Sequence, residues 1–243
     1  MSAEALRRAS VRAWAAWAPG LEERGAWEAW CEKPEPLAAE GHPKAAFLPA
    51  MLRRRCSPLT RIILTAAFEC VGEEALPNVR TVFASRHGSV NESIDMLGQI
   101  AQGSRLSPMR FSHTVHNAQA GLFCIAAQNR EASSSLAGRE DTFGCGYLEA
   151  LGHLEREPER PVLLVMGDVQ LAPDFATLVD EPPRSYAVAF LLARSADGTE
   201  LQFDVAGGDP APEFGWPHAA EFLRFLRSTD DALSVGRFHW RRI

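Results

Sequence analysis

The chain has 243 residues, 46% of them hydrophobic, which is enough for one large domain or two small ones with a substantial core. Its 25 lysines and arginines stand against 31 aspartates and glutamates, which gives a net charge of −6. This mild acidity argues against an extended nucleic-acid-binding surface.

The five cysteines are scattered and never form a C-x-x-C pair, which argues against a disulfide framework and against a thiolate zinc site. No run reaches the roughly 18 apolar residues of a membrane span. The first residues contain no apolar signal core. We therefore expect a soluble, cytoplasmic protein.

The first third of the chain predicts one strand and two helices. Residues 10–17 favour a strand that ends at Pro19, and residues 18–48 favour an irregular segment with a short helix around residues 21–31. Ser57 followed by Pro58 is typical of a capped helix start. This helix is expected to run to about residue 70, and its predicted buried positions are Leu59, Ile62, Ile63, Ala66, Ala67 and Cys70.

Residues 80–86 predict a second strand. Asn91 is then expected to cap a helix that runs to about residue 102, with Ile94, Leu97 and Ile100 facing inward. A loop over residues 107–116 follows.

The stretch from Asn117 to residue 154 predicts a helix, a short strand, a sharp turn and a second helix. The first helix has apolar positions at three- and four-residue steps, namely Ala118, Gly121, Leu122, Ile125 and Ala126. Residues 133–137 are small and favour a short buried strand. After a turn at residues 138–142, helical spacing returns at Phe143, Tyr147, Leu148, Leu151 and Leu154.

The remaining elements complete an α/β fold. Residues 161–169 form a near-continuous apolar run, the pattern of a central strand. Residues 186–193 and 201–206, joined by residues 195–198, indicate a hairpin. A Pro-rich linker (209–217), a helix (218–227) and a strand near 237–242 follow. The sequence predicts a single layered α/β domain with one mixed, mostly parallel sheet.

Two groups of polar residues suggest chemistry that the sequence context does not support. His113 and His116 form an H-x-x-H pair, but they straddle a loop-to-helix boundary without a nearby acidic ligand. Hydrogen bonding that shapes the loop is the better interpretation. Ser85, His87 and Asp95 could be imagined as a hydrolase triad, yet no G-x-S-x-G elbow exists. We expect neither a metal site nor a cofactor.

Three motifs together resemble one family. They are PAMLRRR at residues 49–55, ASRHG at 84–88 and SPMRFSHTVHNAQAG at 107–121. The chain resembles the N-terminal half of a β-ketoacyl synthase of the thiolase-like class, from about residue 8 to residue 208. Asn117, Ala120 and Gly121 resemble the Asn-x-x-Ala-Gly of that family's interface helix.

The resemblance places a nucleophilic cysteine at the turn after the short strand, and this chain has none there. Counting on from Gly121 without a gap leads to Glu140, while Cys124 and Cys145 fall inside the flanking helices. Glu140 could serve as a general acid or base, but a charge that caps the helix N-terminus is the better interpretation. Because the resemblance covers only the family's N-terminal half, we also expect the second half, which carries two catalytic histidines, to be absent.

The resemblance implies a truncated ketosynthase that acts like a chain length factor in aryl-polyene or xanthomonadin-type pigment synthesis. Residues 1–208 would form the ketosynthase-like domain, and residues 209–243 a helix-strand tail packed on it. The chain would not itself be an enzyme. It would pair with a full-length ketosynthase to form a heterodimer, meet an acyl carrier protein transiently, and close the acyl tunnel. The alternatives are a stand-alone malonyl decarboxylase or acyl hydrolase, and a homodimeric scaffold.

The resemblance also implies roles for particular residues. The loop before the interface helix reaches the partner's acyl pocket in full ketosynthases, which puts Met109, Arg110, Phe111 and Val115 near the tunnel end. The implied subunit interface consists of His116, Asn117, Gly121, Ser133, Ser134, Ser135, Leu136 and Ala137. Arg53, Arg54 and Arg55 could attract the acidic surface of an acyl carrier protein, although a solvated segment or internal salt bridges is the favoured interpretation.

Overall fold

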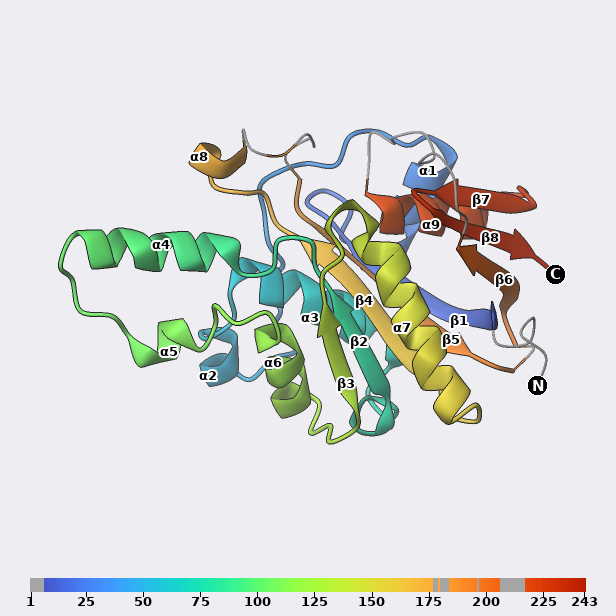
Figure 1. Ribbon diagram of the computed structural model, residues 1–243, viewed down its shortest axis with the longest axis horizontal. Coiled ribbons are helices and arrows are strands. Elements are labelled where there is room, and N and C mark those ends of the chain that lie inside the picture. Colours follow the sequence, from blue (N-terminus) through green and yellow to red (C-terminus); the bar gives the residue numbers. More distant parts are fainter. Residues whose placement is uncertain (1–6, 177–178, 180–183, 196, 206–216) are drawn as a thin grey trace.

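One mixed sheet runs through the computed structural model, with helices on both of its faces (Figure 1). The structure describes residues 7–176, 179, 184–195, 197–205 and 217–243. Among these residues, eight strands form the sheet in the order β3-β2-β4-β5-β1-β6-β8-β7. The strands are β1 (Arg8–Trp17), β2 (Arg80–Ala84), β3 (Ser133–Leu136), β4 (Val162–Asp168), β5 (Tyr186–Ala193), β6 (Thr199–Val205), β7 (Ala232–Val235) and β8 (Phe238–Arg242).

The α/β fold class is confirmed, but the directions of the strands differ from the prediction. Among the described strands, only β2 with β3 and β2 with β4 pair in parallel, through the crossovers that contain helices. The pairs β4–β5, β5–β1, β1–β6, β6–β8 and β8–β7 are antiparallel. The sheet is therefore mostly antiparallel, because strands from both ends of the chain are added beside the parallel unit.

The predicted hairpin of residues 186–193 and 201–206 is wrong, because β1 lies between β5 and β6 and pairs with both. The connection between β5 and β6 passes close to β1. A Cβ at Gly198, where φ is +115°, would lie 2.3 Å from the carbonyl oxygen of Val11. Glycine is the residue that tolerates this conformation and this approach.

The longer helices cover the sheet on its two faces. Helix α3 (Pro58–Val71) packs behind the sheet in Figure 1, and α7 (Thr142–Arg156) crosses its front. Helix α6 (Ala118–Ala126) shares a core with α3, whereas α9 (His218–Arg227) and α1 (Arg24–Glu32) share a core with α7. The other helical segments are α2 (Ala50–Arg53), α4 (Val90–Ala101), α5 (Pro108–Phe111), α8 (Pro173–Ala176), η2 (Leu76–Asn78) and η3 (Arg139–Asp141).

Helix α3 and strand β4 form as the sequence predicts. The Ser57 hydroxyl accepts a hydrogen bond from the amide of Thr60, and Pro58 occupies the first turn of α3. All six residues predicted to be inside α3 are buried, as is every residue of β4. The apolar positions of α3 and the continuous apolar run of β4 therefore predicted correctly that both elements lie in the core.

Several apolar positions predicted to face inward are exposed instead. In α4, Leu97 and Ile100 are 62% and 55% exposed, and Met96 is the buried residue. Ile125 of α6 and Leu148 of α7 are also exposed. The periodicity correctly predicted helices, but the apolar stripes are wider than the core that this chain provides.

Two further local predictions are wrong. Asn91 does not cap α4, because its side chain donates to the carbonyl of Gln170 and accepts from the amide of Ala172. Strand β3 is the edge strand of the sheet and is partly exposed rather than buried.

The C-terminal residues contribute to the same core as α7. Strand β8 pairs with β6, and Trp240 is fully buried among aromatic side chains that include Phe143 and Phe222. Helix α9 and β8 match the predicted helix and strand, while β7 was missed. The predicted linker lies outside the described residues up to residue 216, so the division at residue 208 stays a prediction. In the described part of the chain, no helix combines the length and apolarity needed to cross a membrane.

The contact between α7 and β8 generates a stability prediction with an internal control. A Cβ at Gly144 would lie 2.0 Å from Cδ2 of Phe238, whereas nothing lies within 4 Å of a Cβ at Gly152 on the same helix. We expect Gly144→Ala to lower the free energy of unfolding by about 1–3 kcal/mol through overpacking. Gly152→Ala should raise it by about 0.5–1 kcal/mol through helix propensity.

Urea unfolding of both variants checks this prediction. Equal effects of the two substitutions would contradict the close packing of β8 against α7.

Candidate functional site

A sharp turn between β3 and α7 presents Glu140 at the carboxyl end of the edge strand. The turn is held by Thr142, whose hydroxyl accepts from the amide of Gly138 at 2.9 Å and donates to the carbonyl of Arg139 at 2.6 Å. Arg139 adopts a left-handed conformation, with φ of 57°. Glu140 lies in η3, directly before α7, at the elbow to which counting along the sequence led.

The Glu140 carboxylate forms ion pairs with two arginines. The Arg86 guanidinium donates to Oε1 at 2.8 Å, and Nε of Arg139 lies 3.7 Å from Oε2. The Glu140 side chain is 58% exposed. The elbow therefore presents a carboxylate paired with guanidinium groups, and the Cys145 sulfur lies beside it, 2.9 Å from where a Cβ at Gly138 would stand.

A buried carboxylate at the end of β4 fixes the loop that supplies Arg86. Asp168 accepts hydrogen bonds from the Ser85 hydroxyl at 2.7 Å, the His87 amide at 3.0 Å and the Arg86 amide at 3.1 Å. Burial raises the pKa of Asp168, and the hydrogen bonds from His87 and Ser85 act in the opposite direction. The sequence analysis missed this residue, although a lone acid at the end of an apolar strand run is a recognisable signal.

The structure separates the residues of the imagined hydrolase triad. Ser85 is hydrogen-bonded to Asp168, while Asp95 pairs with Arg110 at 3.3 Å on another part of the molecule. Ser85 also accepts from the Gly88 amide at 2.8 Å. These contacts shape a loop and do not activate a hydroxyl.

His116 and His113 have different surroundings. Nε2 of His116 lies 3.2 Å from the carbonyl oxygen of Ser85, and its ring lies where a Cβ at Gly88 would approach to 3.1 Å. Nδ1 of His113 is buried without a hydrogen-bond partner in the described chain, and burial followed by the charge of Arg55 lowers the pKa of His113. Over the described ranges, no cluster of three or more metal-binding side chains is present.

The two cysteines nearest the elbow in sequence have raised pKa values. Burial raises the pKa of Cys124 in α6 and of Cys145 in α7, and the charge of Asp141 raises the latter further. Arg237 acts in the opposite direction on Cys145 but does not reverse the shift. Since the thiolate is the nucleophilic form, a raised pKa lowers the reactive fraction of each thiol near neutral pH.

The edge strand β3 and one face of α6 form an open surface, which we call the edge surface. Asn117, Gly121 and Ile125 repeat every four residues, so they share a face of the helix, and all three are exposed. The Ser134 hydroxyl is turned toward α7, donating to Glu149 at 2.7 Å with His153 Nε2 at 3.1 Å. Its side chain is thus satisfied within the chain, while the outer backbone edge of β3 has no neighbouring strand among the described residues.

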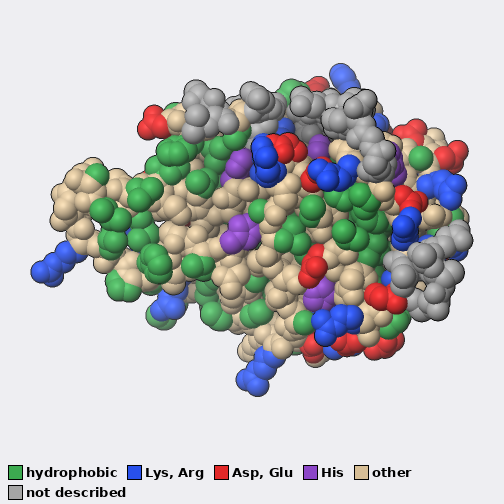
Figure 2. All heavy atoms as spheres, viewed as in Figure 1, with side chains coloured by type: hydrophobic (Ala, Val, Ile, Leu, Met, Phe, Trp, Pro, Cys, Tyr) green, Lys and Arg blue, Asp and Glu red, His purple; other side chains and the backbone are tan. Residues whose placement is uncertain are grey.

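Helices α4 and α5 project beyond the end of the sheet, and we call residues 90–115 the apolar arm (Figure 1). Figure 2 shows hydrophobic side chains gathered on this projecting end. Its exposed large apolar residues are Leu97, Ile100, Leu106, Met109, Phe111 and Val115. Arg110 joins α5 to α4 through its pair with Asp95. A cluster of this kind is typical of a surface that another molecule covers.

The functional residues predicted from the sequence thus lie in three separate places in the structure. Met109, Arg110, Phe111 and Val115 lie on the apolar arm, and Glu140 lies at the elbow. The other predicted residues lie on or beside the edge surface, except His116, whose ring contacts the loop after β2.

The sequence matches the family described as β-ketoacyl synthase, N-terminal domain, over residues 27–241. The chain therefore belongs to this family. The match extends past residue 208, where the motif resemblance was expected to end, and takes in α9, β7 and β8. A comparison with curated proteins found no match.

Solved structures with the same fold include ketosynthases and their complexes. A structure of the ketosynthase ApeO in complex with its chain length factor ApeC from Xenorhabdus doucetiae contains a similar chain, with 27% identity and a TM-score of 0.76. The alignment covers 96% of this chain and 98% of that chain, so the two have nearly equal lengths.

Two more distant structures show the fold alone. The ishigamide ketosynthase/chain length factor gives 14% identity and a TM-score of 0.64, covering 81% of this chain and 67% of that one. The second is a structure of a type II polyketide synthase acyl-carrier protein in complex with its ketosynthase bound to the hexaketide. It shows 12% identity and a TM-score of 0.63, and the alignment covers 82% of this chain and 69% of that chain.

The raised thiol pKa values generate a reactivity prediction. At pH 7 we expect Cys124 and Cys145 to react with iodoacetamide more slowly than a free cysteine, whose thiol has a pKa of about 8.5. Because their pKa values are raised, the rates should keep rising above pH 9. Peptide mapping by mass spectrometry after timed alkylation measures both sites, with the urea-unfolded chain as the reference. Fast labelling of either residue at pH 7 in the folded protein would contradict the shift.

Proposed function

We propose that the chain is a non-catalytic, chain-length-factor-like partner of a full-length β-ketoacyl-acyl carrier protein synthase, working in polyene chain elongation of the aryl-polyene type. The similarity to a chain of almost the same length in a ketosynthase–chain length factor complex carries this proposal. That similarity extends over nearly all of both chains, so it concerns the whole described fold and not one motif.

The chemistry of the elbow supports the absence of a condensing activity. Condensation by a ketosynthase needs a thiolate to hold the acyl chain and imidazoles to assist decarboxylation. Glu140 stands at the elbow in an ion pair with Arg86, and the nearest thiols remain protonated. In our proposal the Glu140–Arg86 pair fixes the turn and takes no part in a reaction.

The edge surface would form the centre of the subunit interface. An unpaired edge strand accepts another strand through its free backbone groups and is a liability if left open. We infer that β3 pairs antiparallel with the matching strand of the ketosynthase and that the exposed face of α6 packs beside it. Gly121 on that face allows a close approach of two helices, and Ile125 supplies apolar contact area.

The apolar arm would reach the acyl tunnel of the ketosynthase partner. Phe111 is 61% exposed in this chain and so is not part of its core. We infer that Met109, Phe111 and Val115 become buried at the tunnel end, where a stiff phenyl side chain stops the growing product. An acyl carrier protein would deliver the chain to the complex transiently.

Co-expression with a neighbouring full-length ketosynthase, followed by size-exclusion chromatography, tests the partnership. We expect a heterodimer with an interface on the order of 2,000 Å² or more. Ile125→Glu should abolish co-elution, because it would bury an unpaired charge at the centre of the interface. Val205→Glu is the matched control, since Val205 is also exposed but lies five strands away from β3.

A chain that condenses or decarboxylates malonyl units without any partner would contradict the proposed function. If the wild type, Ile125→Glu and Val205→Glu all co-elute equally with the ketosynthase, the edge surface is not the interface.

Product length tests the role of the apolar arm in the reconstituted complex. Two C–C bonds lengthen an extended chain by roughly 2.5 Å. Phe111→Ala should therefore lengthen the polyene by about one or two two-carbon units, and Val115→Trp should shorten it. The control is Met51→Ala, which truncates another exposed apolar residue outside the arm. Mass spectrometry of the products gives the answer, and folded complexes with unchanged product lengths would refute the tunnel role.

A further inference from the structure

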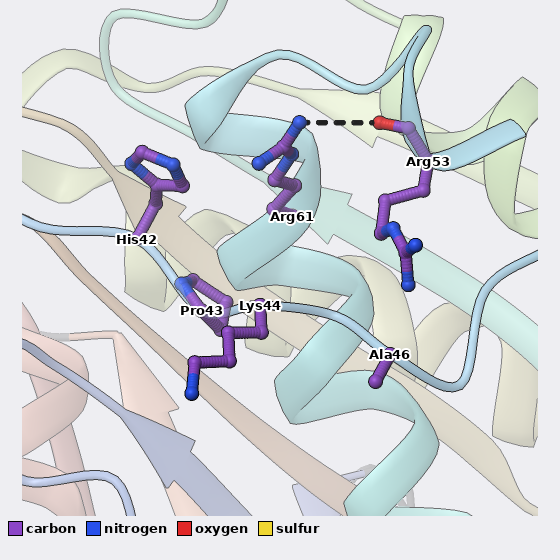
Figure 3. A pocket seen from close by; sticks show the side chains of 6 residues that line it. All are labelled: His42, Pro43, Lys44, Ala46, Arg53 and Arg61. Carbon is purple, nitrogen blue, oxygen red and sulfur yellow. Dashed lines mark hydrogen bonds between the residues drawn. The ribbon is translucent and has the colours of Figure 1, made fainter. Parts of the chain in front are cut away.

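A cavity of ≈ 460 Å³ lies among the loop before α2, α2 itself and the first turn of α3 (Figure 3). It is lined by His42, Pro43, Lys44, Ala46, Arg53 and Arg61. Small-molecule sites have volumes of about 300–1,000 Å³, so the cavity is large enough for a compact ligand. It belongs neither to the elbow nor to the edge surface nor to the apolar arm.

Arg53 and Arg61 are only partly exposed and yet have no acidic partner among the described residues. Within the described residues, no carboxylate lies within 4.0 Å of either guanidinium or of the Lys44 ammonium. Nη2 of Arg61 donates to the carbonyl of Arg53 at 3.3 Å, and Nε of Arg61 is buried without a partner in the same part of the chain. A guanidinium group has five N–H donors, so most of this donor capacity is unused.

Physical chemistry makes this arrangement costly without an anion. Like charges around one cavity repel each other, and the buried Nε of Arg61 lacks a hydrogen-bond partner among the described residues. The chain as a whole has a net charge of −6, so carboxylates are abundant elsewhere in it. The cavity also lies beside the N-terminal turn of the fourteen-residue helix α3, whose dipole favours negative charge there.

We propose that this cavity binds a small molecule that carries a phosphate or diphosphate group. Planar guanidinium groups bind phosphate oxygens through two parallel hydrogen bonds, which suits Arg53 and Arg61, and Lys44 adds a mobile point charge. An acidic protein surface would meet the exposed Arg54 and Arg55, whereas a ligand in the cavity would meet the partly buried Arg53 and Arg61 that line it. The site does not depend on the proposed function.

Isothermal titration calorimetry of the full chain with inorganic pyrophosphate, and separately with inorganic phosphate, tests the proposal. We expect Arg53→Gln and Arg61→Gln to weaken pyrophosphate binding at least about tenfold, because each removes charge-assisted hydrogen bonds. Arg54→Gln is the matched control. It removes the same charge from the adjacent exposed residue and should change the dissociation constant less than about twofold.

Lys44→Gln keeps the test decisive if the Arg61 variant folds poorly, because Lys44 is exposed on a loop and its loss leaves the core intact. This variant should also weaken binding. Absence of pyrophosphate binding to the wild-type chain would overturn the proposal. Equal weakening by Arg53→Gln and Arg54→Gln would also overturn it, because that result indicates a diffuse basic surface suited to an acidic protein.

Discussion

The carboxylate of Asp168 lies at the end of the central strand β4 and accepts three hydrogen bonds from the residues that follow β2. Removing a carboxylate from water is unfavourable, and a buried one is retained where several donors surround it. The loop fixed in this way sends Arg86 to Glu140 and offers the Ser85 carbonyl to His116. It also places Ser89, whose hydroxyl accepts from Gln119 of α6. One buried acid therefore helps to position three parts of the structure, namely the elbow, the start of the apolar arm and helix α6.

The elbow is held from its other side by the C-terminal strands. Arg237, in the turn between β7 and β8, pairs with Asp141 at 2.7 Å, and Phe238 fills the space that a side chain at Gly144 would need. Glu140 and Asp141 thus each pair with an arginine from a different part of the chain. These ion pairs connect the turn to the loop after β2 and to the turn between β7 and β8, which is consistent with a structural role for both acids.

What the sequence predicted well depended on local chemistry, and what it missed depended on distant pairing. Ser57 with Pro58 defines the start of α3 without any knowledge of the fold, and the elbow at Glu140 followed from counting along motifs. The insertion of β1 between β5 and β6 cannot be read from either apolar run, because two adjacent strands joined by a short Asp-Gly link also fit a hairpin. The partners of Asp168 lie more than 80 residues away in sequence, so no local pattern reveals them.

The errors at Leu97, Ile100 and Ile125 have a different origin, since periodicity shows that a helix has an apolar face but not which molecule covers it. Covering a fully exposed large apolar side chain contributes about 1.5–3 kcal/mol. The six exposed apolar residues of the arm are each already partly covered, so together they would contribute roughly 5–9 kcal/mol on association. Association itself costs an estimated 4–15 kcal/mol. The apolar arm alone therefore leaves little or no surplus of free energy for a stable complex. In the proposed complex, the backbone pairing of β3 and the packing of α6 would add to this contribution, and the arm's specific role would be its position at the partner's tunnel.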